Sequence, residues 1–278
     1  MAAAKRVAAA AALLMALAAP GAGAARAEED DVELATELAN PLANLISIPF
    51  QGNYNSGLGP LEDGRRVSVN VQPVLPFSLD EDWNLISRTI LPVTWQDDLF
   101  PGAGTQFGLG NTTQSLFLSP ARMSNGFTWG AGPVFLLPTH TDELLGLDTW
   151  GAGPTAVGLW QGNGWTVGML ANHIWSVAGS DDDAVNATYL QPFVSYTTPD
   201  AWTFSLNTES TYDWKSEEWS MPLNASVSKL VKLGGKLPVS FSGGVRYWVA
   251  SPENTGPEGW GARFGFTVLL PRAGARPQ

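Results

Sequence analysis

The chain has 278 residues, among them twelve Trp and thirty Gly, and it has no Cys. The length suits one large domain or two small ones, and the lack of Cys excludes a disulfide framework and a thiolate metal site. The formal net charge of -11 argues against a nucleic-acid partner, because proteins that bind nucleic acids present basic surfaces.

The first residues have the pattern of a secretory signal peptide. Two basic residues precede an apolar run over residues 7–19, which is too short to cross a bilayer as a helix. Cleavage fits after Ala24 or after Ala27, and the second is preferred because the acidic start EEDD follows it. We therefore predict a signal peptide over residues 1–27 and export of the remainder; the alternative is a cytosolic Ala-rich helix. Removing its three basic residues leaves 12 basic against 26 acidic residues, a net charge of -14.

The one helical pattern after this segment is DVELATELANPLA, residues 31–43. Leu34, Leu38 and Leu42 recur at intervals of four residues, and Pro41 predicts an early end. We expect an N-terminal helical segment within residues 28–44. A helix this short is not stable alone in water, so its leucine stripe needs an apolar surface.

The rest of the chain is predicted to form strands, with apolar and polar residues alternating. Twelve strands are expected, over residues 44–54, 66–77, 83–95, 107–119, 127–137, 150–161, 165–177, 185–198, 201–214, 219–231, 237–249 and 260–270. The alternation is blurred in the third, fourth and seventh of these, where a β-bulge is expected. No linker divides the chain, so we predict one domain over residues 45–270 and a short tail over 271–278.

Strand length and aromatic placement favour a membrane barrel. Tilted membrane strands need roughly 9–11 residues, whereas soluble strands average about 5–6. Trp202 and Trp214 lie on one face, and at ~3.3 Å per residue and a tilt near 40° they are about 30 Å apart along the membrane normal. Tight turns, such as residues 161–164, alternate with long loops, such as 250–259. We predict an all-β fold, a single antiparallel transmembrane β-barrel of about twelve strands in the outer membrane; the alternative is an exported, soluble, glycan-binding β-sandwich.

In such a barrel the polar side chains of each strand face the lumen. By this rule the inward set is Arg66, Asn70, Gln72, Arg88, Asn172, Asn207, Glu209, Asn224, Arg246 and Arg263. Two roles remain open for it, a constriction that selects solutes and an internal network of ion pairs that fills the barrel. Glu209 lies in the middle of its strand, and either Arg88 or Arg246 is its expected partner.

Glycines gather in strands four to seven, where the motif WGAGP occurs twice. By parity, five of them face the lumen and leave room there: Gly130, Gly132, Gly151, Gly153 and Gly168. No helix follows either motif, so they do not predict a nucleotide site. The N-terminal helix can pack on this glycine-rich wall or lie in the membrane interface. We prefer the wall, which would make the segment a partial plug.

The sequence offers little for catalysis or metal binding. Its two histidines, His140 and His173, have no nucleophile beside them on the same strand face. The acidic residues gather in the expected outer loops, and Asp181–Asp183 lacks the Gly and terminal Glu of a calcium loop. We therefore predict no catalytic residue, no metal, no cofactor and no enzymatic activity.

Several segments resemble a known family. NLISIPFQ, QPVLPFSL, DWNLISRTILPV, FGLGNTTQSLFLSP, WGAGPVFLLPT, GPTAVGLWQ and LNTESTYDW are similar to a bacterial outer-membrane transporter family named as a component of the meta-pathway of phenol degradation, whose members are often mislabelled neuromedin U. The resemblance covers residues 34–270. It implies a barrel that passes small solutes, aromatic or apolar ones among them. Its partners would be outer-membrane lipid, lipopolysaccharide and the barrel-assembly machinery. A barrel with only a structural or adhesive role is the alternative.

Overall fold

The computed structural model describes residues 25–270, with side chains from residue 29 onward. The predicted signal peptide overlaps this range only at residues 25–27, and the predicted tail 271–278 lies outside it. The described chain begins with a helix, α2 (Ala25–Leu38), and continues as fifteen strand segments in one sheet. Within residues 25–270 no helix is long and apolar enough to cross a lipid bilayer.

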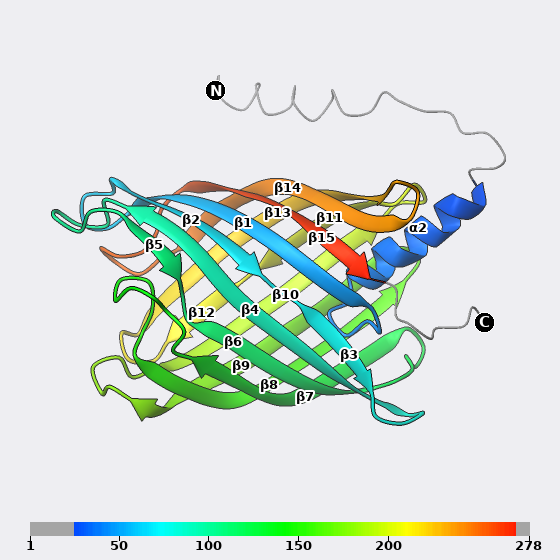
Figure 1. Ribbon diagram of the computed structural model, residues 1–278, viewed down its shortest axis with the longest axis horizontal. Helices are drawn as coiled ribbons and strands as arrows, with labels where there is room; N and C mark the ends of the chain where they lie inside the picture. Colours follow the sequence, from blue (N-terminus) through cyan, green and yellow to red (C-terminus); the bar gives the residue numbers. More distant parts are fainter. Residues whose placement is uncertain (1–24, 271–278) are drawn as a thin grey trace, which may run out of the picture.

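The strand segments follow one another as an antiparallel meander (Figure 1). They are β1 (Ile46–Leu58), β2 (Gly64–Val71), β3 (Val74–Ser78), β4 (Trp83–Asp97), β5 (Gln106–Leu109), β6 (Thr112–Pro120), β7 (Phe127–Leu137), β8 (Thr149–Gly162), β9 (Trp165–Gly179), β10 (Asn186–Thr197), β11 (Trp202–Thr208), β12 (Ser210–Asp213), β13 (Glu218–Leu233), β14 (Leu237–Ala250) and β15 (Trp260–Leu270).

The sheet closes on itself. β15 pairs with β1 from Ile46↔Leu270 to Tyr54↔Ala262. Three barrel strands are each divided into two segments, β2 with β3, β5 with β6, and β11 with β12, so the fifteen segments make twelve strands. The prediction of a twelve-stranded antiparallel barrel is confirmed, and the alternative of a soluble sandwich is wrong, because the sheet leaves no open edge at its ends.

The divided strands have local causes. Pro73, between β2 and β3, has no N–H to donate to the ladder. At the second break the register shifts: Val93 of β4 pairs with Leu109 of β5. Ile90, three residues before Val93 on β4, pairs with Thr113 of β6, which is four residues after Leu109. One extra residue therefore sits between β5 and β6, which explains the blurred alternation of this strand.

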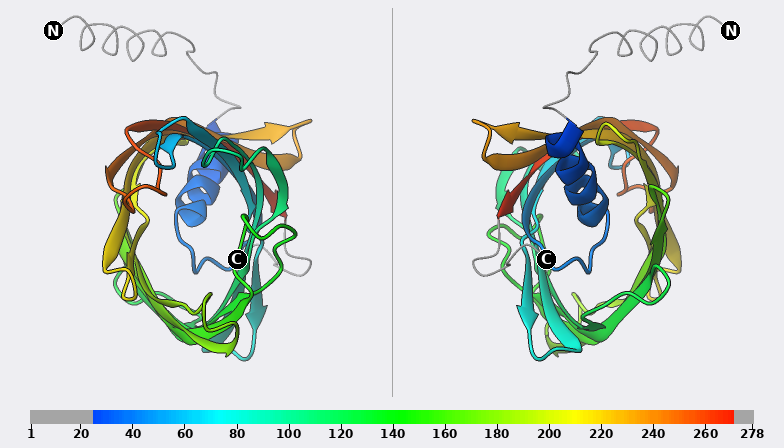
Figure 2. Two further views of the ribbon diagram at one scale, coloured as in Figure 1. Left: turned by 90° about the vertical axis from the view of Figure 1, so that its left-hand side faces the viewer. Right: turned by 90° about the vertical axis from the view of Figure 1, so that its right-hand side faces the viewer.

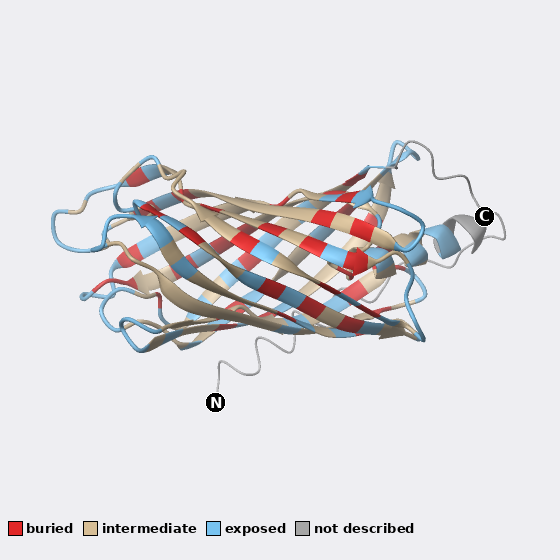
Figure 3. Ribbon diagram, turned by 90° about the horizontal axis from the view of Figure 1, so that it is seen from below, coloured by how far each residue is buried: buried red, intermediate tan, exposed pale blue. Residues whose placement is uncertain are grey.

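The barrel has its apolar face outward. Large apolar side chains that alternate along the strands are exposed, including Phe107, Trp150, Trp165, Met169, Phe204, Trp214, Phe241, Val245 and Trp260. Polar side chains are buried inward, including Asn53, Gln72, Gln96, Thr155, Asn224, Arg246 and Arg263. Figure 3 shows buried and exposed positions scattered in alternation along the strands. Because soluble proteins bury apolar surface, this arrangement is typical of a barrel surrounded by lipid.

The two ends of the barrel differ. Helix α2, the start of β1 and the end of β15 lie at one end of the barrel, here called the helix end (Figure 1). The connections there are short: residues 79–82, 121–126, 163–164, 198–201 and 234–236. The tightest is an Asn163–Gly164 hairpin, in which both residues have the positive φ that such a turn requires. The opposite end, here called the loop end, carries longer connections at 98–105, 138–148 and 251–259.

The helix differs from its predicted bounds of 31–43. It ends at Leu38, three residues before Pro41, and Leu42 lies in the turn that follows. Viewed along the barrel, α2 lies within the outline of the strands rather than outside it (Figure 2). The leucines therefore do not form one stripe: Leu34 and Leu38 pack beside buried Ala201 and Leu230 at the rim, and Leu42 packs elsewhere.

Candidate functional site in the barrel lumen

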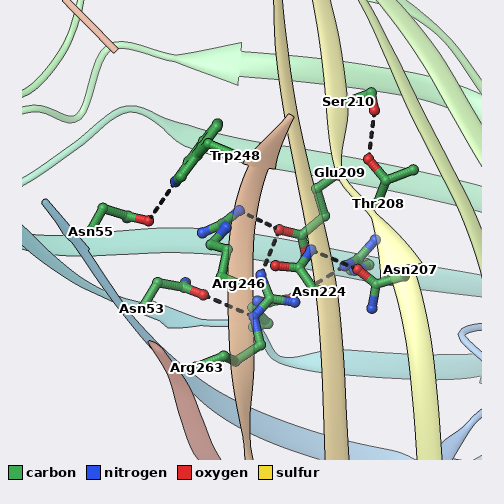
Figure 4. Close-up of polar contacts among 12 residues, drawn as sticks. Asn53, Asn55, Asn207, Thr208, Glu209, Ser210, Asn224, Arg246, Trp248 and Arg263 are labelled. Carbon is green, nitrogen blue, oxygen red and sulfur yellow. Dashed lines mark hydrogen bonds and ion pairs between the residues drawn. The ribbon is translucent and has the colours of Figure 1, made fainter. Parts of the chain in front are cut away.

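A charged cluster joins side chains from several strands of the barrel (Figure 4). Glu209 stands between β11 and β12, and its Oε2 accepts hydrogen bonds from Arg246 Nη2 of β14 at 2.9 Å and from Arg263 Nη2 of β15 at 2.7 Å. The three side chains are 18%, 9% and 7% exposed, respectively. Shielding from water strengthens each ion pair, and the shared oxygen fixes both guanidinium groups.

Amides complete the cluster. Asn53 of β1 accepts a hydrogen bond from Arg263 Nε at 2.9 Å, and Asn224 donates one to Asn207 at 2.9 Å. Within this cluster, two buried polar atoms have no hydrogen-bond partner among the described residues: Asn224 Oδ1 and Arg246 Nε. Arg246 also lies against the Trp248 ring, 4.9 Å from its centre. The cluster thus has a positively charged donor left without an acceptor.

The other predicted lumen residues also face inward but stand apart from Glu209. Arg88 donates to the amide oxygen of Gln72 at 3.1 Å, and Asn70 and Asn172 line the same cavity. Arg66 lies toward the loop end, where its Nε donates to Gln96 at 2.8 Å. Of the two expected partners of Glu209, Arg246 is the one found. Arg88 pairs with an amide instead, and Arg263 is a partner that strand parity did not distinguish from the rest.

Two cavities meet in the barrel. The inner cavity, about 280 Å³, opens toward α2 and is lined by Glu37, Asn40, Pro41, Phe193 and Asn207, among others. The middle cavity, about 390 Å³, is lined by Asn70, Ile90, Asn172, Tyr189, Glu209 and Arg246, among others. Gln72, Arg88 and Leu170 line both cavities, so these three side chains form the junction between them.

The segment after α2 enters the lumen. Asn40 donates from its side-chain amide to Gln161 at 3.2 Å, and its Oδ1 accepts the backbone N–H of Leu42 at 2.8 Å. Gln161 in turn donates to the carbonyl of Thr36 at 2.8 Å. Leu42 is buried with Phe117. A Cβ added at Gly130 would lie 2.9 Å from the Cδ2 of Leu42. The missing side chain at Gly130 therefore gives Leu42 its place.

An apolar cluster lines this part of the interior, and inspection of the sequence did not predict it. Ile86, Phe117, Val157, Leu159 and Leu170 are buried together with Leu42. They come from strands whose neighbouring outward residues are also apolar, so the alternation there was weak. The weak alternation was the feature of the sequence that could have predicted this cluster, because strands with two apolar faces lack a clear alternation of apolar and polar residues.

At the loop end, the connection over residues 138–148 folds against inward positions of the barrel. Gln96 donates to the backbone carbonyl of Leu144 at 2.9 Å, and Asn111 donates to that of Leu147 at 2.8 Å. His140 contacts Asn111 and lies 3.3 Å from Asp148. The connection thus lies against the barrel wall at this mouth, as the segment after α2 does at the other.

Solved structures with the same architecture are outer-membrane proteins. A crystal structure of an outer membrane channel from Pseudomonas putida F1 is 14% identical, with a TM-score of 0.62 over 81% of this chain and 94% of that one. The NanC porin is 10% identical, with a TM-score of 0.52 over 80% of this chain and 100% of that one. The fold is that of outer-membrane β-barrels. No protein-family model matches the chain, and no curated protein matches it.

One sequence-based prediction needs correction. Outer membrane phospholipase A from Escherichia coli is also among the similar structures, at 13% identity and a TM-score of 0.48 over 82% of this chain and 90% of that one. This likeness concerns the fold alone, and the prediction of no enzymatic activity is withdrawn. As for metals, no group of three or more His, Asp or Glu side chains within residues 29–270 is placed to hold an ion.

Proposed function

We propose that the protein is an outer-membrane channel for small solutes, aromatic or apolar ones among them. The observation that carries the proposal is the pair of adjoining cavities inside a barrel whose exterior is apolar. The longer loops would face the exterior and the helix end the periplasm, as in bacterial outer-membrane barrels. The outward residues would contact lipid and lipopolysaccharide, and insertion would need the barrel-assembly machinery.

The mixed lining of the lumen supports the choice of solutes. The interior combines the charged cluster around Glu209 with the apolar cluster around Phe117. The polar part of a solute could therefore bind charged side chains, and its apolar part could contact apolar ones. The resemblance of the sequence to transporters named for phenol degradation agrees with such solutes. A role as a component of that meta-pathway is part of the proposal.

The segment over residues 28–44 is proposed to act as a partial plug. Its turn is held by Gln161 and by the contact of Leu42 with Phe117 at Gly130, and its side chains line the inner cavity. Solutes would then pass along a narrow path rather than an open pore.

The test is uptake by intact cells. In a strain lacking the gene, the initial uptake of radiolabelled phenol should fall several-fold, and the full chain supplied in trans should restore it. Uptake of labelled glycerol, an uncharged aliphatic solute, is the comparison and should fall less than uptake of phenol. Unchanged phenol uptake, with the protein present as a heat-modifiable band in the outer-membrane fraction of the complemented strain, would favour a structural or adhesive barrel.

A further inference from the structure

The arginine side chains of the lumen outnumber the carboxylates that face them. Arg88, Arg246 and Arg263 supply three positive charges at the middle of the barrel, and Glu209 supplies one negative charge. The sum over these four side chains is 3 − 1 = +2 at neutral pH. A fixed positive charge in a narrow lumen raises the local concentration of anions and lowers that of cations.

Arg88 has N–H groups left to bind an anion. Arg246 and Arg263 both bind Glu209, whereas Arg88 has one hydrogen bond, to the neutral amide of Gln72. No carboxylate of residues 29–270 lies within ion-pair distance of Arg88. A guanidinium has five N–H donors, and two of them can grip both oxygens of a carboxylate.

The position of Arg88 suits an entering anion. It lines both cavities at their junction, so any solute that moves from the middle cavity to the inner cavity passes it. Arg246 also lines the middle cavity, which adds a second guanidinium group beside the same space.

The middle cavity also has an apolar side. Four uncharged apolar side chains contribute to its lining: Ile90, Leu136, Leu170 and Ile174. A bare inorganic anion would leave that surface in contact with water, whereas an organic acid would cover it. The volume of about 390 Å³ lies within the range of small-molecule sites.

The acidic loops do not cancel this field. Arg88 and Asp97 are nine residues apart on β4, about 30 Å along the strand. Exposed charges are screened beyond about 8 Å at physiological ionic strength. The loop carboxylates therefore do not neutralise Arg88. The carboxylate among the residues that line the inner cavity is Glu37, which lies on α2.

We propose that the middle cavity is a binding site for an amphipathic organic carboxylate, with Arg88 holding the carboxylate and the apolar wall holding the rest. The inference rests on the proposed channel function and adds the chemical class of its solute. It makes the channel anion-selective.

The binding test uses benzoate and its uncharged analogue benzyl alcohol, titrated calorimetrically into the full chain in detergent. Benzoate should bind at least about tenfold more tightly, since a hydrogen-bonded charge contributes about 1.5–3 kcal/mol. Arg88→Gln should remove that difference. Arg88→Lys, which keeps the charge but loses the two-pronged grip, should keep part of it. Arg122→Gln, in an exposed turn outside the lumen, removes the same charge and should change nothing. Equal affinity for the two probes in the intact chain would overturn the proposal.

The selectivity test separates this inference from the channel itself. In a potassium chloride gradient across a planar bilayer, the intact chain should pass chloride in preference to potassium, and Arg88→Gln should reduce that preference while Arg122→Gln does not. Conductance with a preference for cations would overturn the inference and leave the channel standing. Benzoate binding that depends on Arg88, without any conductance, would uphold the site and count against the channel.

Discussion

Glu209 holds together strands that are far apart in the sequence. Its one oxygen joins Arg246 of β14 and Arg263 of β15, and Arg263 continues the network to Asn53 of β1. The network therefore spans the seam where the last strand meets the first. Removing one partner of a buried ion pair leaves the other charge without compensation, which costs more than the pair itself contributes.

Glu209→Gln tests this network. The charge of the four central side chains should rise from +2 to +3, so the preference for anions should increase. The variant should also unfold at a lower temperature, with a loss on the order of 3 kcal/mol, because two buried guanidinium groups keep only a neutral acceptor. Reversal potentials and the temperature of the gel-mobility shift measure the two effects. Glu81→Gln, in an exposed turn at the helix end, is the matched control. An unchanged transition temperature would contradict the structural part.

Strand parity predicted which residues face the lumen, but not which of them meet. Parity depends only on neighbouring residues within a strand, whereas the partner of Glu209 depends on the stagger of β11 and β12 against β14 and β15. The alternation places both Arg88 and Arg263 on the lumen side of their strands. Only the three-dimensional register shows that Arg263 binds Glu209 and that Arg88 does not.

At the scale of elements, the N-terminal segment and the barrel wall have complementary shapes. Gly130 on β7 makes room for Leu42, and Phe117 on β6 covers it from the side. The sequence contained both halves of this contact, the leucines and the inward glycines. It did not show that α2 would end at Leu38, which sends Leu42 to the wall while Leu34 and Leu38 stay at the rim.

Gly130→Val should push Leu42 from its place and loosen the segment whose other side chains line the inner cavity. The added Cβ alone would come within 2.9 Å of Leu42 Cδ2 and 3.2 Å of Phe117 Cβ, and the leucine can move because the contact is with the end of its side chain. Single-channel conductance should increase. Gly243→Val is the matched control, because a Cβ there meets nothing within 4 Å and the position faces outward. An equal conductance of both variants and the parent would show that Leu42 does not obstruct the path.

Acidification should strengthen the seating of α2. Partial burial, and then the neighbouring Glu33, raise the pKa of Glu37 above its ordinary value. A carboxyl with a raised pKa weakens the folded arrangement while it is ionised, and this penalty disappears as the pH falls through the raised pKa. Conductance should therefore decrease as the pH is lowered from neutrality toward that pKa. Glu37→Gln should flatten this dependence, whereas Glu81→Gln should not; an identical pH profile in Glu37→Gln would refute the assignment.

At the scale of the whole molecule, the barrel reverses the usual distribution of side chains. Trp and Phe residues cover the outside, and amides, hydroxyls and arginines fill the inside. Strand number, closure and the outward face followed from alternation and strand length, because a membrane imposes both. The inward apolar cluster did not, since Ile86, Phe117 and Leu159 break the alternation on which that reasoning depends.

We expect the lumen to conduct and the N-terminal segment to narrow it. The measurement is single-channel recording in planar bilayers, with the intact chain beside a variant lacking residues 31–43 but keeping the first 27 residues. The deletion removes the Asp31–Lys232 ion pair and Leu42 together. We predict discrete steps for both proteins and larger steps for the deletion. Steps of equal size would place the segment outside the conducting path, and no steps from either correctly folded protein would contradict the channel.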